Sequence, residues 1–211
     1  PYLSCKGEQW TPRMVWGVED IVMCPGKEDM FNFLEDVVRE VVPLFPGKYF
    51  HIGGDECPKT SWKNCPTCQK RIQAEGLQAD GKHSAEERLQ SYVIKRMEKM
   101  LAKYDRKIIG WDEILEGGLS PDATVMSWRG TSGGISAALQ KHDVIMTPGS
   151  GGLYLDHYQG DYKIEPVTIP SAPAYLSRTY NYEPVPDTIK SLGLEKHILG
   201  VQCNNWSEYM Y

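Results

Sequence analysis

Short apolar runs alternate with longer stretches of helical periodicity along this chain. Each run is four to six residues long, as is usual for buried strands, and several are followed by glycine, proline or an acidic residue. A run of this length between turn residues is too short for most helices. The pattern predicts strands at residues 21–24, 49–53, 107–111, 123–128, 144–147 and 198–202.

Helical spacing of apolar residues separates several of these runs. Residues 28–44 carry one apolar face, which predicts an amphipathic helix. Ser84 and Glu87 form a capping-box signature that begins a second helix, and residues 133–141 predict a short third helix. A loop rich in proline and tyrosine is expected from 149 to about 190. Strands and helices in this order indicate an α/β fold with parallel strands and right-handed crossovers.

Length and charge restrict the class of protein. The chain has 211 residues, somewhat fewer than the ~250 of a typical α/β barrel. A net charge of -5 without a long basic run argues against a nucleic-acid partner. No apolar stretch is long enough to span a membrane. The chain begins with Pro1 instead of an initiator methionine, so we expect it to be part of a longer protein.

Six cysteines are too few for a disulfide scaffold at this length. A Cys-x-x-Cys pair with further ligands nearby is one way to build a structural zinc site. The candidate ligands for such a site are Cys57, Cys65, Cys68 and His83. Because a second Cys-x-x-Cys pair is missing, free thiols or one disulfide are the favoured interpretation. Cys5 and Cys24 flank a loop and could be joined by a disulfide in an oxidising compartment.

The strand predicted at 49–53 runs into Gly-Gly-Asp-Glu at residues 53–56. Adjacent residues on a strand face opposite sides, so Asp55 and Glu56 share one cleft only if the glycines let the chain leave strand geometry. Two carboxylates held together do not ionise independently, and the one that keeps its proton can act as a general acid. Two other interpretations stay open, a surface turn and the nucleotide-binding hairpin of diguanylate cyclases. In those cyclases phenylalanine follows, whereas here Cys57 follows.

Acidic and aromatic residues follow several of the predicted strands. Barrel enzymes carry their active sites at the carboxyl ends of the strands. Aromatic rings can stack on the C–H face of a sugar while carboxylates accept hydrogen bonds from its hydroxyl groups, so the pattern favours a carbohydrate ligand. The residues concerned are Trp111, Trp128, Tyr154, Asp156, Trp206 and Glu208.

Five ordered motifs make the chain similar to family 20 glycoside hydrolases, the β-N-acetylhexosaminidases. The motifs are HIGGDE at 51–56, GWDE at 110–113, SWRG at 127–130, YLD at 154–156 and QCNNWSE at 202–208. The resemblance implies an incomplete (β/α)8 TIM barrel in which strands 3–8 are present and strands 1–2 are absent. Residues 1–211 would then form the C-terminal three-quarters of the catalytic barrel. An arginine that binds sugar hydroxyls and a histidine near the acids would lie in the absent part.

The resemblance also implies a mechanism. In this retaining family the 2-acetamido oxygen of the substrate attacks the anomeric carbon and forms an oxazolinium ion, so no protein nucleophile is needed. Glu56 would be the general acid and then the base, Asp55 would orient the acetamido N–H, and Tyr154 would bind the acetamido oxygen. The pocket walls and the acceptors of sugar hydroxyls would be Trp111, Trp128, Trp206, Asp156 and Glu208. This chemistry requires no cofactor and no metal.

The expected partners are glycans that end in N-acetylglucosamine or N-acetylgalactosamine. The sequence does not distinguish between these two sugars, and it does not determine the oligomeric state. The Cys-Pro segments at 57–58 and 65–68 resemble those of enzymes of Bacteroides-type bacteria. The resemblance implies a periplasmic, extracellular or cell-surface location in a bacterium. Two alternatives remain. A non-catalytic sugar-binding fragment would keep the tryptophans without the acid, and a nucleotide cyclase would need a phosphate-binding loop.

Overall fold

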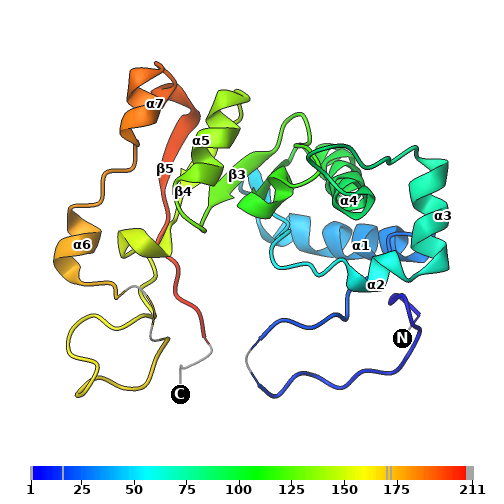
Figure 1. Ribbon diagram of the computed structural model, residues 1–211, viewed down its shortest axis with the longest axis horizontal. Helices are drawn as coiled ribbons and strands as arrows, with labels where there is room; N and C mark the ends of the chain where they lie inside the picture. Colours follow the sequence, from blue (N-terminus) through cyan, green and yellow to red (C-terminus); the bar gives the residue numbers. More distant parts are fainter. Residues whose placement is uncertain (1, 16, 170, 172, 208–211) are drawn as a thin grey trace. The chain divides into compact units, whose positions relative to one another are not determined.

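The structure is a computed structural model that describes residues 2–15, 17–169, 171 and 173–207 (Figure 1). The chain divides into two compact units, Pro1–Ala123 and Thr124–Tyr211. The boundary falls directly before a strand, so no separate linker joins the two units.

Two parallel strands joined by a long helix form the centre of the first unit. β1 (Tyr49–His51) pairs with β2 (Lys107–Trp111) in parallel, with Phe50 opposite Ile108. α4 (Ala85–Ala102) connects the two strands in sequence and packs against β2. The parallel pairing that the strand–helix order predicts is therefore confirmed in this unit.

The predicted helix at 28–44 is formed by α1 (Glu28–Val41) and the short 3-10 helix η1 (Val42–Leu44). Its buried side chains include Met30, Phe31 and Val38. Phe31 meets the ring of Tyr92 on α4 edge-on, with the ring centroids 5.9 Å apart. Figure 1 shows α1 and α4 lying near each other in this unit, as the contact between them requires.

Two helices that the periodicity does not predict follow β1. They are α2 (Thr60–Lys63) and α3 (Pro66–Ala74), which begins with a proline at its first position. Glu28 at the start of α1 pairs with Arg71 of α3 at 2.9 Å and with Arg96 of α4. The hydrogen bond from Arg96 is the main reason that the pKa of Glu28 lies below its usual value. One carboxylate thus joins three helices.

The predicted capping box starts α4. The Ser84 hydroxyl accepts from the Glu87 N–H at 3.2 Å, and the Glu87 carboxylate accepts from the Ser84 N–H at 2.6 Å. Both donors would otherwise lack an intrahelical partner, so the prediction of the helix start is confirmed.

The strand expected at residues 21–24 does not form, which corrects the sequence prediction. Only Met23 pairs, in an isolated antiparallel bridge with Ser4. Ile21 and Met23 are both exposed, and a turn at Pro25 ends the run at once. A short run with exposed side chains lacks the burial that holds a parallel strand. The described residues therefore contain five strands and not six.

The second unit is built on three parallel strands. β3 (Thr124–Ser127) pairs with β4 (Val144–Met146), and β4 pairs with β5 (Ile198–Val201). α5 (Ser132–Leu139) joins β3 to β4 and packs against both. The predicted strands and the short helix are thus confirmed, and the strand ends all lie at one edge of the sheet.

The predicted loop at 149 to about 190 contains short helices. They are η3 (Gly149–Gly151), α6 (Leu176–Tyr180) and α7 (Asp187–Ser191), followed by η4 (Glu195–His197) before β5. α6 and α7 have 5 residues each, too few for a periodic pattern to be recognised in the sequence.

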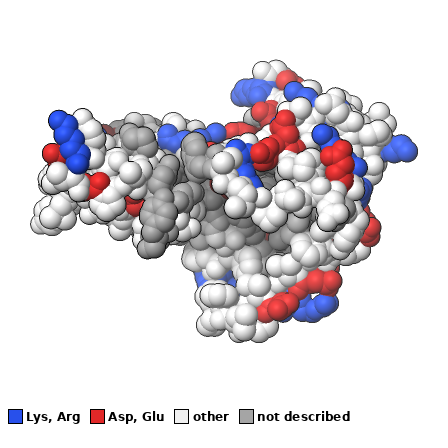
Figure 2. Space-filling view, turned by 90° about the horizontal axis from the view of Figure 1, so that it is seen from below, with Lys and Arg blue, Asp and Glu red and all other residues white. Residues whose placement is uncertain are grey.

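Charged side chains of both signs are interspersed on the face drawn in Figure 2. Within the described part of the chain, no helix combines the length and apolarity that a membrane crossing demands.

Candidate active site

The backbone leaves strand geometry directly after β1, as predicted. φ is 73° at Gly53, 99° at Gly54 and 42° at Glu56, all in the left-handed region. Gly54 is required for a second reason, because a Cβ there would lie 2.7 Å from Cγ2 of Ile114. The turn leaves Asp55 and Glu56 exposed to solvent, where a substrate can reach both carboxylates.

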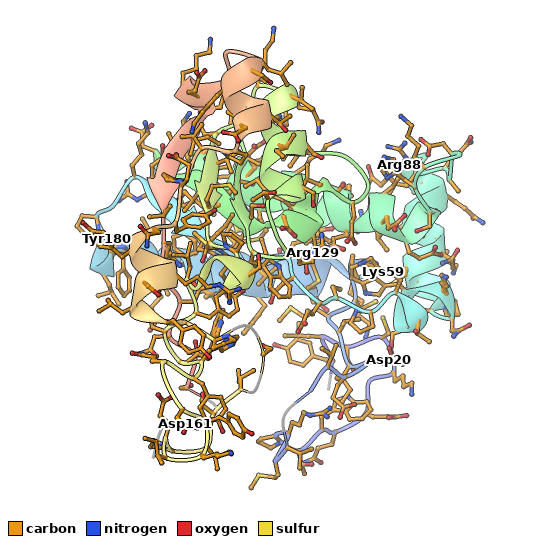
Figure 3. All side chains as sticks on the ribbon, turned by 60° about the vertical axis from the view of Figure 1, so that its left-hand side comes forward. Asp20, Lys59, Arg88, Arg129, Asp161 and Tyr180 are labelled. Atoms are coloured by element: carbon orange, nitrogen blue, oxygen red, sulfur yellow. The ribbon has the colours of Figure 1, made fainter. Side chains whose placement is uncertain are left out.

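Hydrogen bonds from β2 and α4 hold this turn. The N–H of Trp111 donates to the Gly53 carbonyl at 2.9 Å, and Nε2 of Gln90 donates to the Gly54 carbonyl at 2.7 Å. Gln90 is only 4% exposed, and its Oε1 accepts from Nζ of Lys59, which Figure 3 labels. The side chain of one α4 residue therefore connects the turn to the segment that follows it.

His51 supports the turn from its base. The N–H of Gly53 donates to Nδ1 of His51 at 3.0 Å, so Nδ1 is an acceptor and carries no proton. The imidazole lies against the indole of Trp111, with centroids 4.7 Å apart. Desolvation lowers the pKa of His51 below its ordinary value of 6.5, and the negative charge of Asp55 opposes this shift. The neutral form is thus the one that the turn requires.

Trp111 and Trp128 occupy strand ends in different units. Trp111 ends β2, is 8% exposed and begins the 3-10 helix η2 (Asp112–Leu115). Trp128 directly follows β3 and is half-buried. Behind Trp128 the Ser127 hydroxyl donates to the Gly130 carbonyl at 2.7 Å, which fixes the backbone on both sides of the indole.

The segment after η3 pairs with the segment after β5. Tyr154 and Asn204 form a parallel bridge, and the N–H of Leu155 donates to the Asn204 carbonyl at 2.7 Å. Tyr154 is buried and its ring meets His157 edge-on, at 5.2 Å between centroids. Two of the motifs that the sequence singles out, YLD and QCNNWSE, are thereby brought side by side.

A cavity of about 310 Å³ opens beside this pairing. Its lining includes Asp156, His157, Glu165, Thr168, Asn205 and Trp206. Cavities that bind small molecules usually exceed about 300 Å³, so this one is large enough for a single sugar ring. Oδ1 of Asp156 is buried without a hydrogen-bond partner among the described residues. An unpaired buried carboxylate oxygen is costly, so this oxygen remains available as a hydrogen-bond acceptor in the lining of the cavity.

The sequence did not indicate every residue at this site. Gln90 reaches the acid turn from the middle of a helix, where a buried glutamine leaves no motif. Glu165 and Thr168 line the cavity from a stretch predicted only as loop, and Thr168 donates to the Asp156 carbonyl. Glu208 lies outside the described residues, so its expected role in sugar binding stays a prediction.

The four residues considered for zinc do not come together, which corrects the proposed ligand set. Sγ atoms of Cys5, Cys24, Cys65 and Cys68 instead lie within 4.8 Å of one another, and we call this group the four-thiol cluster. All six cysteines carry free thiols, so the disulfide considered for Cys5 and Cys24 is absent as well. His83 accepts from the Gly117 N–H at 3.3 Å instead. Cys57 and His83 were included in the predicted set because they lie near Cys65 and Cys68 in sequence. In the fold, the N-terminal segment reaches the start of α3, so Cys5 and Cys24 take their places.

The strands are parallel and connected by helices, and exposed acids and aromatic side chains follow the strand ends. This arrangement defines an enzyme of the α/β barrel class. The chain belongs to glycosyl hydrolase family 20, whose catalytic domain matches residues 1–211. This membership excludes the diguanylate cyclase interpretation of residues 53–56. The (β/α)8 TIM barrel expected from the sequence is thus confirmed as the fold class, and the chain holds part of it.

Individual relatives agree with this assignment. The chain is 57% identical to a β-hexosaminidase of Porphyromonas gingivalis over 100% of its own length, and 34% identical to one of Vibrio furnissii over 98%. Its fold is similar to the exo-β-N-acetylglucosaminidase of Vibrio harveyi, with a TM-score of 0.78 and 30% identity over 90% of this chain and 29% of that one. The chain spans 26% and 33% of the two β-hexosaminidases.

Proposed function

We propose that the protein is a retaining exo-β-N-acetylhexosaminidase that removes terminal N-acetylglucosamine or N-acetylgalactosamine from glycans. The observation that carries the proposal is the turn after β1, which presents Asp55 and Glu56 together at a strand end. Hydrogen bonds to Gln90 and Trp111 hold this turn in place, as a catalytic role of its carboxylates requires. The β-hexosaminidase relatives named above support the same activity.

Glu56 acts in this proposal as general acid and base. In the first step it protonates the glycosidic oxygen while the acetamido oxygen of the substrate bonds to the anomeric carbon. In the second step it removes a proton from water, which attacks that carbon and opens the oxazolinium ring. Asp55 accepts from the acetamido N–H and stabilises the positive charge that develops there. The exposure of both carboxylates in the first unit agrees with these roles.

Aromatic residues hold the acetamido group and the sugar. Tyr154 donates to the acetamido oxygen, and Trp111, Trp128 and Trp206 surround the methyl group and the sugar face. Holding the acetamido group near the anomeric carbon makes the attack effectively unimolecular, an effect worth up to ~7–11 kcal/mol in well-oriented systems. The cavity beside Trp206 and the unpaired oxygen of Asp156 support sugar binding in the second unit.

The test uses the full-length protein with chromogenic β-N-acetylglucosaminide and β-N-acetylgalactosaminide substrates. We expect hydrolysis with retained anomeric configuration, and a thiazoline mimic of the oxazolinium ion that binds far more tightly than N-acetylglucosamine. Sugar binding without turnover would support the non-catalytic alternative instead. Equal affinity for the thiazoline and the free sugar would contradict the participation of the acetamido group.

The location follows from the substrate. Glycans with terminal N-acetylhexosamine occur mainly outside the cytoplasm, so we propose a periplasmic, extracellular or cell-surface location in a bacterium. Fractionation of the native host with an antibody against the protein tests this, and recovery in the cytoplasmic fraction would contradict it.

A further inference from the structure

The four-thiol cluster lies in the first unit and takes no part in the proposed chemistry. Cys24 and Cys68 are 0% exposed, Cys65 is 5% exposed and Cys5 is half-buried. The distance between sulfur atoms is 3.5 Å from Cys24 to Cys68, 3.7 Å from Cys24 to Cys65 and 3.7 Å from Cys5 to Cys68. All four sulfur atoms lie within 4.8 Å of one another, so the cluster is compact enough to surround a single ion.

Three separate segments supply the four thiols. The N–H of Cys24 donates to the Leu3 carbonyl at 2.8 Å, and Nζ of Lys27 donates to the Ser4 carbonyl at 2.8 Å. These bonds, with the bridge between Ser4 and Met23, hold Cys5 beside Cys24. The cluster is therefore fixed on one side by backbone pairing of the N-terminal segment.

The other side of the cluster is the start of α3. Cys65 is the N-cap of this helix and Cys68 lies in its first turn, so their side chains share one face. A Cβ on Gly26 would lie 2.4 Å from the backbone of Thr67, so only glycine allows the turn after Cys24 to approach α3 this closely.

Two simpler accounts of the cluster fit less well. Buried cysteines can act as small apolar residues, but apolar packing does not require four of them to converge on one point. Disulfides need sulfurs about 2.0 Å apart, and every measured separation is far longer. Tetrahedral zinc with Zn–S bonds of about 2.3 Å places its sulfurs about 3.8 Å apart, close to the observed distances.

We propose that Cys5, Cys24, Cys65 and Cys68 bind one structural Zn²⁺ as four thiolates. Binding releases four protons from the thiols to solvent and forms four Zn–S bonds, without any oxidation or reduction. The ion has no open coordination position, so it serves folding and not catalysis. The ion would link two parts of the chain, the N-terminal segment and the loop that precedes α1, to the helix α3. This helix begins only a short distance along the chain after Asp55 and Glu56. Trp62, whose Nε1 donates to the Met23 carbonyl at 2.9 Å, supports the same junction.

The test measures metal in the full-length protein, purified without chelators. We expect about one zinc per chain by elemental analysis, and intense sulfur-to-metal charge-transfer bands after zinc is exchanged for Co²⁺. The variants Cys24→Ser and Cys68→Ser should each lose most of the zinc. The matched controls Cys57→Ser, beside the cluster, and Cys203→Ser, in the second unit, should keep it.

Several results would overturn the proposal. They are zinc-free native protein with four alkylatable thiols, a disulfide between any two of the four cysteines, or iron in place of zinc. If the serine variants do not fold, the Co²⁺ spectrum of the wild-type protein still decides the matter, because its absence would exclude a tetrathiolate site. None of these measurements depends on hexosaminidase activity, so this proposal and the proposed function can fail separately.

Discussion

At the scale of single residues, Glu56 combines an unfavourable backbone with an exposed carboxylate. Its φ of 42° lies in the left-handed region, which costs a non-glycine residue about 1–2 kcal/mol. Strain of this kind is most often retained where a side chain must point in one particular direction. The conformation of Glu56 therefore agrees with a role in chemistry better than with a role in stability.

We expect Glu56→Gln to lower turnover of substrates with poor leaving groups by about 10²–10⁴-fold, because a positioned general acid contributes roughly that much. Steady-state kinetics of the full-length protein measure the change. Glu40→Gln, on an exposed position of α1, is the control and should leave turnover unaltered. Near wild-type rates in Glu56→Gln, with thiazoline binding intact, would remove Glu56 from the proposed role.

Asp156 gives a second prediction at this scale. Replacing its carboxylate by an amide in Asp156→Asn weakens a charged hydrogen bond to a sugar hydroxyl, worth about 1.5–3 kcal/mol. We expect kcat/KM to fall about 10–100-fold. Asp161→Asn is the control, since Asp161 is an exposed residue of the same loop region (Figure 3). An unchanged kcat/KM in Asp156→Asn would show that its unpaired oxygen does not meet the substrate.

At the scale of elements, α4 connects the core to the acid turn. Its buried Gln90 donates to the Gly54 carbonyl and accepts from Lys59. The helix is held at its own start by the capping box at Ser84 and by packing against β2 along its length. The position of the turn therefore depends on a helix that is itself fixed at several points.

We expect Gln90→Leu to destabilise the protein by about 1–3 kcal/mol, because the Gly54 carbonyl loses its donor inside the protein. Urea unfolding measures this loss, and a parallel fall in kcat would show that the turn has moved. Gln90→Glu keeps an acceptor for Lys59 but cannot donate to Gly54, so it separates the two bonds. Gln140→Leu, at the exposed residue directly after α5, is the control. Unchanged stability and kcat in Gln90→Leu would contradict a positioning role.

Elements with strong local patterns could be predicted from the sequence. The helices α1 and α4 were predicted because each carries apolar spacing over several turns, and the strands β1 to β5 were predicted because they are apolar runs bounded by turn residues. The prediction of a strand at 21–24 was wrong. Met23 pairs only with Ser4 of the N-terminal segment, and this tertiary contact leaves no local pattern in the sequence. The turn that carries Asp55 and Glu56 was predicted from its motif. The contact of Gln90 with this turn was missed, because it depends on three-dimensional proximity.

At the scale of the whole molecule, pH should act on stability through His51. A histidine whose pKa is lowered by folding stabilises the protein fully above its unfolded pKa, and this contribution is lost as the pH falls toward the folded value. For His51 the loss begins near 6.5. Glu28, whose pKa is also lowered, contributes its full stabilisation above pH 4.5 and loses it only below that pH, so its loss begins at a lower pH than that of His51.

We therefore expect the free energy of unfolding to fall between pH 7.5 and 5 in the wild type, and to fall less in His51→Gln. Urea titrations at several pH values measure both slopes. Gln140→Leu, which removes no ionisable group, is the control and should keep the wild-type slope. Identical slopes in wild type and His51→Gln would contradict the link between the neutral imidazole and the turn after β1.

The four-thiol cluster also has a consequence for the order of events during synthesis. Cys5 and Cys68 are separated by 63 residues, so a ribosome that adds about 5–20 residues per second needs about 3–13 s to supply the second after the first. During that interval Cys5 and Cys24 lack the two thiols at the start of α3 and are open to oxidation. The region before α1 thus cannot reach its final structure until α3 has been made. In a nascent chain released before that point, this region would lack its contacts with α3.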